Sequence, residues 1–158
     1  MEMPPWLQEP GACFVTLTQN GQLRGCIGSL AAHRPLGDDV RANAVAAALR
    51  DPRFPALAVA EWDRTRVEVS VLSPMQPLAF SSEAEALAQL RPHVDGVVLE
   101  YGGHRGTFLP QVWEQLATPK EFMAHLQRKA GLSVDFWADG VRLQRYTVEK
   151  WKEDGPAP

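Results

Sequence analysis

The sequence predicts an α+β fold, with mainly antiparallel β-sheets flanked by helices. The first observation is that β-forming runs are joined by Asn-Gly and Gly-Gly turns, which connect antiparallel neighbours. The second is that single helical segments stand between the strands instead of alternating regularly with them. The chain has 158 residues, 45% of them hydrophobic, and is long enough to fold without a disulfide or a metal.

Composition excludes several classes of protein. A net charge of −3 and the lack of a basic stripe interleaved with aromatics argue against nucleic-acid binding. No apolar run approaches the roughly 20 residues that span a bilayer, so no membrane role is expected. Two cysteines cannot form a disulfide framework, and the acidic, Pro-broken start is not a secretory signal, so we expect a cytoplasmic protein. No phosphate-binding glycine loop and no serine elbow occur.

The first hairpin is predicted around Asn20-Gly21, between β-forming runs at 14–18 and 23–27. Asn-Gly suits a two-residue turn because both central positions need positive φ. Continued without irregularity, that register pairs Val15 with Cys26, and directly opposed side chains share a face. The residues expected on one face are Cys13, Val15, Leu17, Arg24 and Cys26.

A helix and a strand follow. The acidic pair Asp38-Asp39 suits a helix N-terminus, and Asp51-Pro52 ends the helix. Alanines at helical spacing indicate close packing on a sheet. The strand at 66–72 places three valines on one face and Glu68 and Ser70 on the other.

The second half of the chain repeats these signals. Ser82-x-x-Glu85 and Thr118-x-x-Glu121 predict helix starts with capping residues. A Gly-Gly turn predicts a hairpin in which Glu100 faces Arg105 as a cross-strand ion pair. The last strand is predicted at 141–149.

Cys26 is the first candidate for chemistry, because glycines surround it in a predicted strand. Gly25 and Gly28 mark a bulge, or a place where a ligand or backbone comes close. Arg24, on the same predicted face, would favour the thiolate and make Cys26 a nucleophile or redox thiol. The alternative is that Cys26 is a small buried hydrophobe. A dithiol or two-thiolate corner with Cys13 is conceivable, but the scattered histidines predict no metal site.

Other candidates have equally plain structural alternatives. Glu68 suits a proton carrier, or belongs to a solvated strand face. Asp51 and Arg53 are held near prolines, in a segment that a simple helix stop explains equally well. Trp113 could be a ligand platform, although a core aromatic is the better interpretation.

Several segments also occur in the order typical of one family, across about residues 11–151. The sequence resembles the AMMECR domain family, whose prokaryotic members are called AmmeMemoRadiSam system protein A. The segments that carry the resemblance are Phe14-Val15-Thr16-Leu17, Leu23-Arg24-Gly25-Cys26-Ile27-Gly28, Arg34-Pro35-Leu36, Asn43-Ala44, Asp51-Pro52-Arg53-Phe54, Glu68-Val69-Ser70-Val71-Leu72, Val94-Asp95-Gly96, Phe108-Leu109-Pro110-Gln111-Val112-Trp113 and Lys129-Ala130-Gly131-Leu132.

The resemblance implies two lobes built around antiparallel sheets, with the hexapeptide 23–28 near a cleft between them. We expect a short leader at 1–12, one AMMECR-type domain at 13–152 and a frayed tail at 153–158. Members of the family usually carry a helix before the first strand, so the short leader departs from the pattern and raises the question of a lost N-terminal helix.

The family has no settled activity, so the resemblance names no reaction and no cofactor. It implies an enzyme, or an accessory subunit, that acts on a small molecule or a modified protein residue alongside a radical SAM enzyme and a Memo-like protein. Cys26 and Glu68 are the expected catalytic residues. The expected binding residues are Arg24, Gly25, Gly28, Asn43, Arg53, Ser70 and Gln111. The alternative is a non-catalytic binding or scaffold module, in which the hexapeptide shapes a groove for a partner.

Overall fold

The computed structural model describes residues 4–153, which divide into two compact units. The first unit holds residues up to Leu72 together with the chain from Glu149, and the second holds Ser73–Val148. Each unit has its own cluster of buried hydrophobic residues. Within the described part of the chain, no helix has the length and apolar character needed to cross a membrane.

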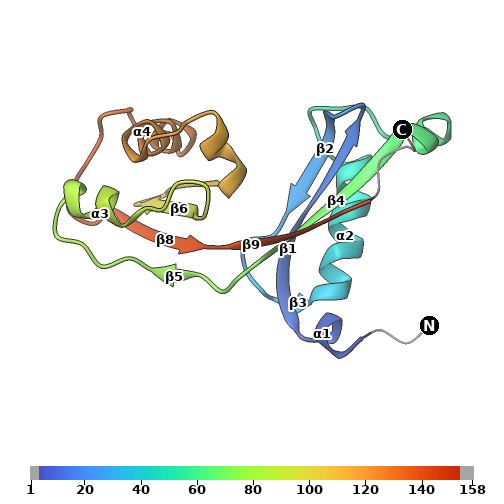
Figure 1. Ribbon diagram of the computed structural model, residues 1–158, viewed down its shortest axis with the longest axis horizontal. Helices are drawn as coiled ribbons and strands as arrows, with labels where there is room; N and C mark the ends of the chain where they lie inside the picture. Colours follow the sequence, from blue (N-terminus) through green and yellow to red (C-terminus); the bar gives the residue numbers. More distant parts are fainter. Residues whose placement is uncertain (1–3, 154–158) are drawn as a thin grey trace. The chain divides into compact units, whose positions relative to one another are not determined.

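The first unit is a twisted sheet with one long helix on one face (Figure 1). Its elements are α1 (Pro5–Gln8), β1 (Pro10–Gln19), β2 (Gln22–Gly28), β3 (Arg34–Pro35), α2 (Leu36–Leu49), the 3₁₀ helix η1 (Val59–Arg64), β4 (Thr65–Leu72) and β9 (Val148–Lys152). The sheet order is β2-β1-β4-β9, and β3 pairs with β1. β1 begins at Pro10, inside the segment predicted as a leader.

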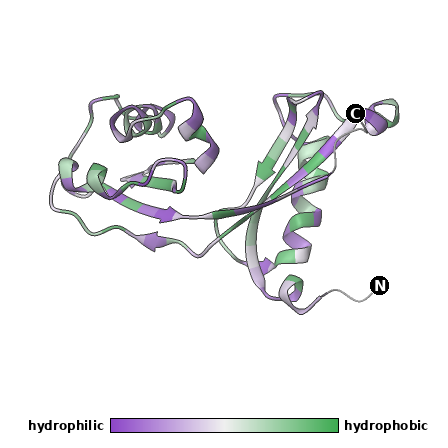
Figure 2. Cartoon of the chain, in the orientation of Figure 1, coloured by the Kyte–Doolittle hydropathy of each residue, from purple (hydrophilic) through white to green (hydrophobic). Residues whose placement is uncertain are grey.

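The core of this unit lies between the sheet and α2. Cys13, Val15 and Leu17 alternate along β1 and are buried with Leu36 and Ala47 of the helix. Figure 2 shows hydrophobic residues both on the strands of this sheet and along α2. The opposite sheet face carries the even-numbered residues of β1 and β4, since side chains alternate between the two faces of a strand.

The predicted hairpin is present, but its register is not the predicted one. Asn20 and Gly21 have φ of 52° and 78°, and the strands meet at a two-residue turn as expected. The register then shifts beside Arg24, which is left as an extra residue in β2. Cys26 therefore pairs with Thr16. The predicted pairing of Cys26 with Val15 is wrong.

This shift changes the face on which Cys26 lies. A slip of one residue moves every later side chain of a strand to the other side of the sheet. Cys13 is buried beneath α2, whereas Cys26 shares the opposite face with Thr16. The predicted set of five residues on one face is therefore wrong, and the two thiols cannot form the conceivable dithiol pair.

The second unit is a four-stranded antiparallel sheet with helices packed against it. Its elements are β5 (Gln76–Pro77), α3 (Glu83–Gln89), β6 (Gly96–Tyr101), β7 (His104–Phe108), the 3₁₀ helix η2 (Pro110–Glu114), α4 (Pro119–Lys129) and β8 (Arg142–Tyr146). The strand order is β5-β8-β6-β7. Trp113 is fully buried and stacks on Phe122 with ring centroids 3.9 Å apart, which confirms the core interpretation of Trp113.

Local signals in this unit are mostly confirmed. The hydroxyls of Ser82 and Thr118 accept the backbone N–H groups three residues later and begin α3 and α4. Glu100 and Arg105 form the expected ion pair, with Nε 3.1 Å from Oε1. The single strand predicted at 141–149 is wrong, because the chain breaks at Thr147 into β8 and β9, which join different sheets.

Candidate functional site

The two glycines of the hexapeptide are explained by packing. A Cβ on Gly25 would lie 2.3 Å from the backbone oxygen of Ala47, so a side chain there would push β2 away from α2. A Cβ on Gly28 would lie 2.2 Å from the ring of Phe14, which occupies that space. Strand glycines often mark such close approaches. Both were predicted as binding residues, and in the structure each makes room for another part of the protein.

Arg24 is held by a carboxylate from another segment. Only 7% exposed, it donates from Nε and Nη2 to the two oxygens of Glu61, at 3.0 and 3.2 Å. Its Nη2 also donates to the carbonyl oxygen of Pro55 at 2.8 Å. The hydrogen bond from Arg24 is the largest of the effects that lower the pKa of Glu61 to about 2. Arg24 thus fastens the 55–61 segment to β2, and the prediction that it activates Cys26 does not follow from this geometry.

Cys26 is surrounded by a hydroxyl, a carboxylate and a different arginine. Its half-buried sulfur lies 3.3 Å from Oγ1 of Thr16. Because β2 is an edge strand, its outward N–H groups have no strand partner. The Cys26 N–H donates instead to Asp51 at 3.0 Å, and Arg53 donates to the Cys26 carbonyl at 3.4 Å.

Asp51 and Arg53 form a rigid clamp on this edge. Nε and Nη2 of Arg53 donate to the two carboxylate oxygens of Asp51, at 3.0 and 2.7 Å. These hydrogen bonds hold the pKa of Asp51 well below its usual range, against the opposing effect of burial. The side chain of Arg53 remains 54% exposed. Of the two arginines predicted to bind, Arg53 is the one that lies beside Cys26.

A thiol, a hydroxyl and a carboxylate form a row across three strands. Thr16 of β1 pairs with Cys26 of β2 on one side and with Glu68 of β4 on the other. Directly opposed residues have Cβ atoms about 4.5–5.5 Å apart. Oε1 of Glu68 is buried and has no hydrogen-bond partner among residues 4–153, although Nζ of Lys150 lies 3.6 Å away. Sequence reasoning missed Thr16, because the uninterrupted register placed Val15 opposite Cys26.

The remaining predicted residues lie in different surroundings. Ser70 is buried on β4, on the same face as Glu68, and pairs with Phe14. Asn43 is buried on α2, beneath the opposite face. Gln111 is exposed on η2, in the second unit.

Asn43 belongs to a closed polar cluster around Asp39. The fully buried carboxylate of Asp39 accepts hydrogen bonds from Asn43, from Ser29, from Arg34 and from the backbone and thiol of Cys13. Burial would raise the pKa of Asp39, but the hydrogen bonds from Ser29, Arg34 and Cys13 lower it overall. Burial raises the pKa of Cys13 to about 12. The cluster holds the start of α2 against β1, and its polar groups form hydrogen bonds with one another.

Comparisons with known proteins identify the family and the fold. The family model described as AMMECR1 matches residues 1–151. The chain belongs to the AMMECR1 family. Protein MJ0810 of Methanocaldococcus jannaschii is 37% identical, over 97% of this chain and 78% of its own length. A protein of Methanothermobacter thermautotrophicus is 39% identical, over 98% of this chain and 81% of its own. The crystal structure of uncharacterized protein PH0010 from Pyrococcus horikoshii superposes with a TM-score of 0.90 at 34% identity, covering 98% of this chain and 81% of that one.

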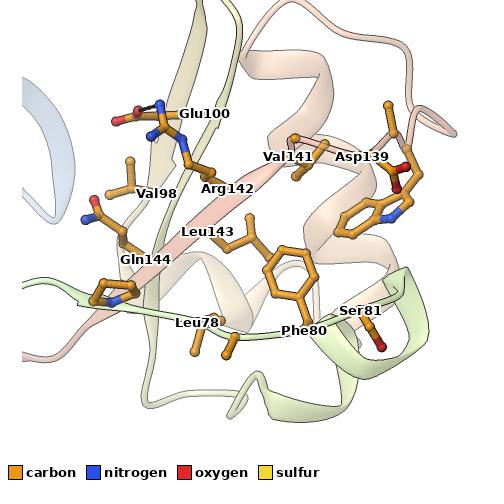
Figure 3. Close-up of a pocket in the computed structure, with 15 residues that line it drawn as sticks. Leu78, Phe80, Ser81, Val98, Glu100, Asp139, Val141, Arg142, Leu143 and Gln144 are labelled. Atoms are coloured by element: carbon orange, nitrogen blue, oxygen red, sulfur yellow. Dashed lines mark ion pairs between the residues drawn. The ribbon is translucent and has the colours of Figure 1, made fainter.

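This AMMECR1 protein has a hollow in each unit. In the first unit, a hollow of about 610 Å³ is lined by Thr18, Arg66, Glu68 and Lys152, among others. This hollow therefore lies next to Glu68, the carboxylate in the row of Cys26, Thr16 and Glu68. In the second unit, a hollow of about 650 Å³ lies beside β8 (Figure 3). Within the described residues, no group of three or more His, Cys, Asp or Glu side chains is placed to hold a metal ion.

Proposed function

We propose that this AMMECR1 protein is an enzyme, or a subunit of one, in which the sulfur of Cys26 attacks a small electrophilic molecule or a modified protein residue. One observation carries the proposal. Cys26 lies on the sheet face opposite α2, in a row with a hydroxyl and a half-buried carboxylate. Close packing accounts for the glycines at positions 25 and 28, and the ion pair with Glu61 accounts for Arg24. Neither reason accounts for a cysteine at position 26.

The row suggests how the thiol loses its proton. The hydroxyl of Thr16 lies within hydrogen-bond distance of Sγ, and Glu68, which pairs with Thr16 on the neighbouring strand, is the proposed final acceptor of the thiol proton. The sulfur then uses its electron pair to form a bond to the electrophilic carbon, and the electron pair of the bond that breaks there leaves with the displaced group or, at a carbonyl, moves onto its oxygen. Arg53, exposed at the strand edge, offers a cation for a negatively charged part of the substrate. The hollow that Glu68 lines provides room beside the row.

Thiol reactivity tests this proposal without a known substrate. We expect Cys26 to react with iodoacetamide at neutral pH faster than a free small thiol does. Thr16→Val and Glu68→Gln should each slow this reaction at least about fivefold, because the proton acceptor is lost. Glu114→Gln, an exposed carboxylate of the second unit, is the matched control and should change nothing. A rate equal to that of a free thiol, insensitive to Glu68→Gln, would contradict the enzyme proposal.

The second candidate is a non-catalytic binding or scaffold module. The observation that favours it is the packing of Gly25, Gly28 and Arg24, because half of the hexapeptide then serves to position β2. A module should retain partner binding after Cys26→Ala and lose it after Arg24→Ala or Gly25→Val. An enzyme should lose turnover after Cys26→Ser while keeping its fold.

We also propose that the protein works in the cytoplasm with a radical SAM enzyme and a Memo-like protein. The support is the resemblance to AmmeMemoRadiSam system protein A. Affinity purification of the tagged chain from its native host at natural expression, followed by mass spectrometry, should enrich both partners over an unrelated tagged protein of similar abundance. Failure to enrich either partner would contradict this proposal. It would not affect the chemistry proposed for Cys26, which the alkylation experiment tests separately.

A further inference from the structure

The hollow of the second unit has an aromatic corner. Phe80 precedes α3 and Trp137 precedes β8, and their ring centroids lie 5.5 Å apart with the planes tilted by 51°. Both rings line the hollow, next to Leu78 and Val141. Both side chains pack against the buried core of this unit and remain partly exposed. An aromatic face attracts cations, and the indole of tryptophan does so most strongly.

A carboxylate without a partner stands beside this corner. Asp139 lines the hollow two residues after Trp137, is exposed, and makes no hydrogen bond or ion pair with any described residue. Figure 3 shows Asp139 on the side of the hollow away from the ion pair of Glu100 and Arg142. The negative charge of Asp139 is therefore not neutralised by the protein.

At the opposite end of the hollow, Glu100 and Arg142 line the wall as an ion pair, and Arg105 contacts Glu100 without lining the hollow. Glu100 is shared by two arginines, with Arg105 at 3.1 Å and Arg142 at 3.7 Å. One carboxylate thus faces two guanidinium groups, and the side chain of Arg142 is 80% exposed. This end favours a hydrogen-bond acceptor or an anionic group.

We propose that this hollow binds a small organic ammonium ion, with its cationic head in the corner formed by Phe80, Trp137 and Asp139 and a polar tail directed towards Arg142. The volume of about 650 Å³ suits a small molecule, because ligand pockets usually measure about 300–1,000 Å³. Apolar walls with a few polar groups at defined ends are typical of such sites. A bare metal ion is less suitable, since aromatic rings cannot replace its oxygen or nitrogen ligands.

Choline and its uncharged isostere 3,3-dimethylbutan-1-ol provide a direct test on the full chain. The two probes have nearly the same shape and differ in charge. We expect saturable shifts of the Trp137 indole N–H signal in NMR titrations, with choline binding about fivefold to thirtyfold more tightly than the alcohol. Trp137→Phe assigns that signal among the five tryptophans.

Two exposed carboxylates of one loop give the matched variants. Asp139→Asn should weaken choline binding at least about fivefold and leave binding of the alcohol unchanged. Asp135→Asn, which does not line the hollow, should change neither. Because both side chains are exposed, we expect both variants to fold. Equal affinity for the two probes, equal effects of the two variants, or no saturable shift at millimolar choline would overturn the proposal.

Discussion

The sulfur of Cys26 lies 3.3 Å from the hydroxyl of Thr16, on the sheet face opposite α2. This contact exists because β2 carries one extra residue at Arg24. Without that bulge, Cys26 would pair with Val15 and point into the core. A single irregularity in the ladder therefore decides whether the thiol is a core residue or a candidate nucleophile.

The two cysteines should differ sharply in reactivity. We expect iodoacetamide to label Cys26 in the native protein while Cys13 stays unlabelled, because Cys13 is fully buried and burial raises its pKa to about 12. Peptide mass spectrometry after timed labelling measures this difference. Both cysteines should react in strong denaturant, which serves as the control. Rapid native labelling of Cys13 would contradict the closed cluster around Asp39.

Gly25 should tolerate no side chain. Gly25→Ala places a Cβ against the backbone oxygen of Ala47, so β2 must move away from α2. We expect the free energy of unfolding to fall by about 1–3 kcal/mol, as overpacked cores usually show. Gly103→Ala is the control, because its Cβ would meet nothing within 4 Å, and its effect should stay within about 0.5 kcal/mol. Urea unfolding compares the two, and equal effects would refute the packing role of Gly25.

Acid should weaken the attachment of the 55–61 segment to β2. The hydrogen bond from Arg24 is the main cause that lowers the pKa of Glu61, from the ordinary 4.5 to about 2. A lowered pKa contributes stability that is complete above pH 4.5 and is lost as the pH falls towards 2. Urea midpoints measured from pH 6 to pH 2 should therefore fall more steeply for the wild type than for Glu61→Gln. Parallel curves for the two proteins would show that the ion pair of Arg24 and Glu61 does not contribute to stability.

The carboxylate of Asp39 should be needed for stability. Asp39→Asn removes the charge that several donors share, among them Arg34 at 2.7 Å. A hydrogen bond to a charged group contributes about 1.5–3 kcal/mol, so we expect a loss of at least that size in the free energy of unfolding. The neighbouring exposed Asp38→Asn is the control, with an expected change of about 0.5 kcal/mol or less. Equal losses in the two variants would show that the buried carboxylate of Asp39 contributes no more to stability than an exposed one.

The sequence alone determined features that depend on a few neighbouring residues. The Asn20-Gly21 turn, the helix starts at Ser82 and Thr118, and the cross-strand pair of Glu100 with Arg105 all follow from local geometry, and all are present. The order of the motifs also indicated the AMMECR family, which the match over residues 1–151 confirms.

Tertiary structure decided which side chains meet. Arg24 and Glu61 are 37 positions apart, and nothing in the spacing of the sequence joins them. Gly25 indicated a bulge or a close approach, but the sequence did not place the extra residue at Arg24, because that position depends on how β2 packs on α2 and how the 51–61 segment covers its edge. Local patterns set backbone conformation over a few residues, whereas strand register and charge partners depend on contacts that form only when distant segments fold together.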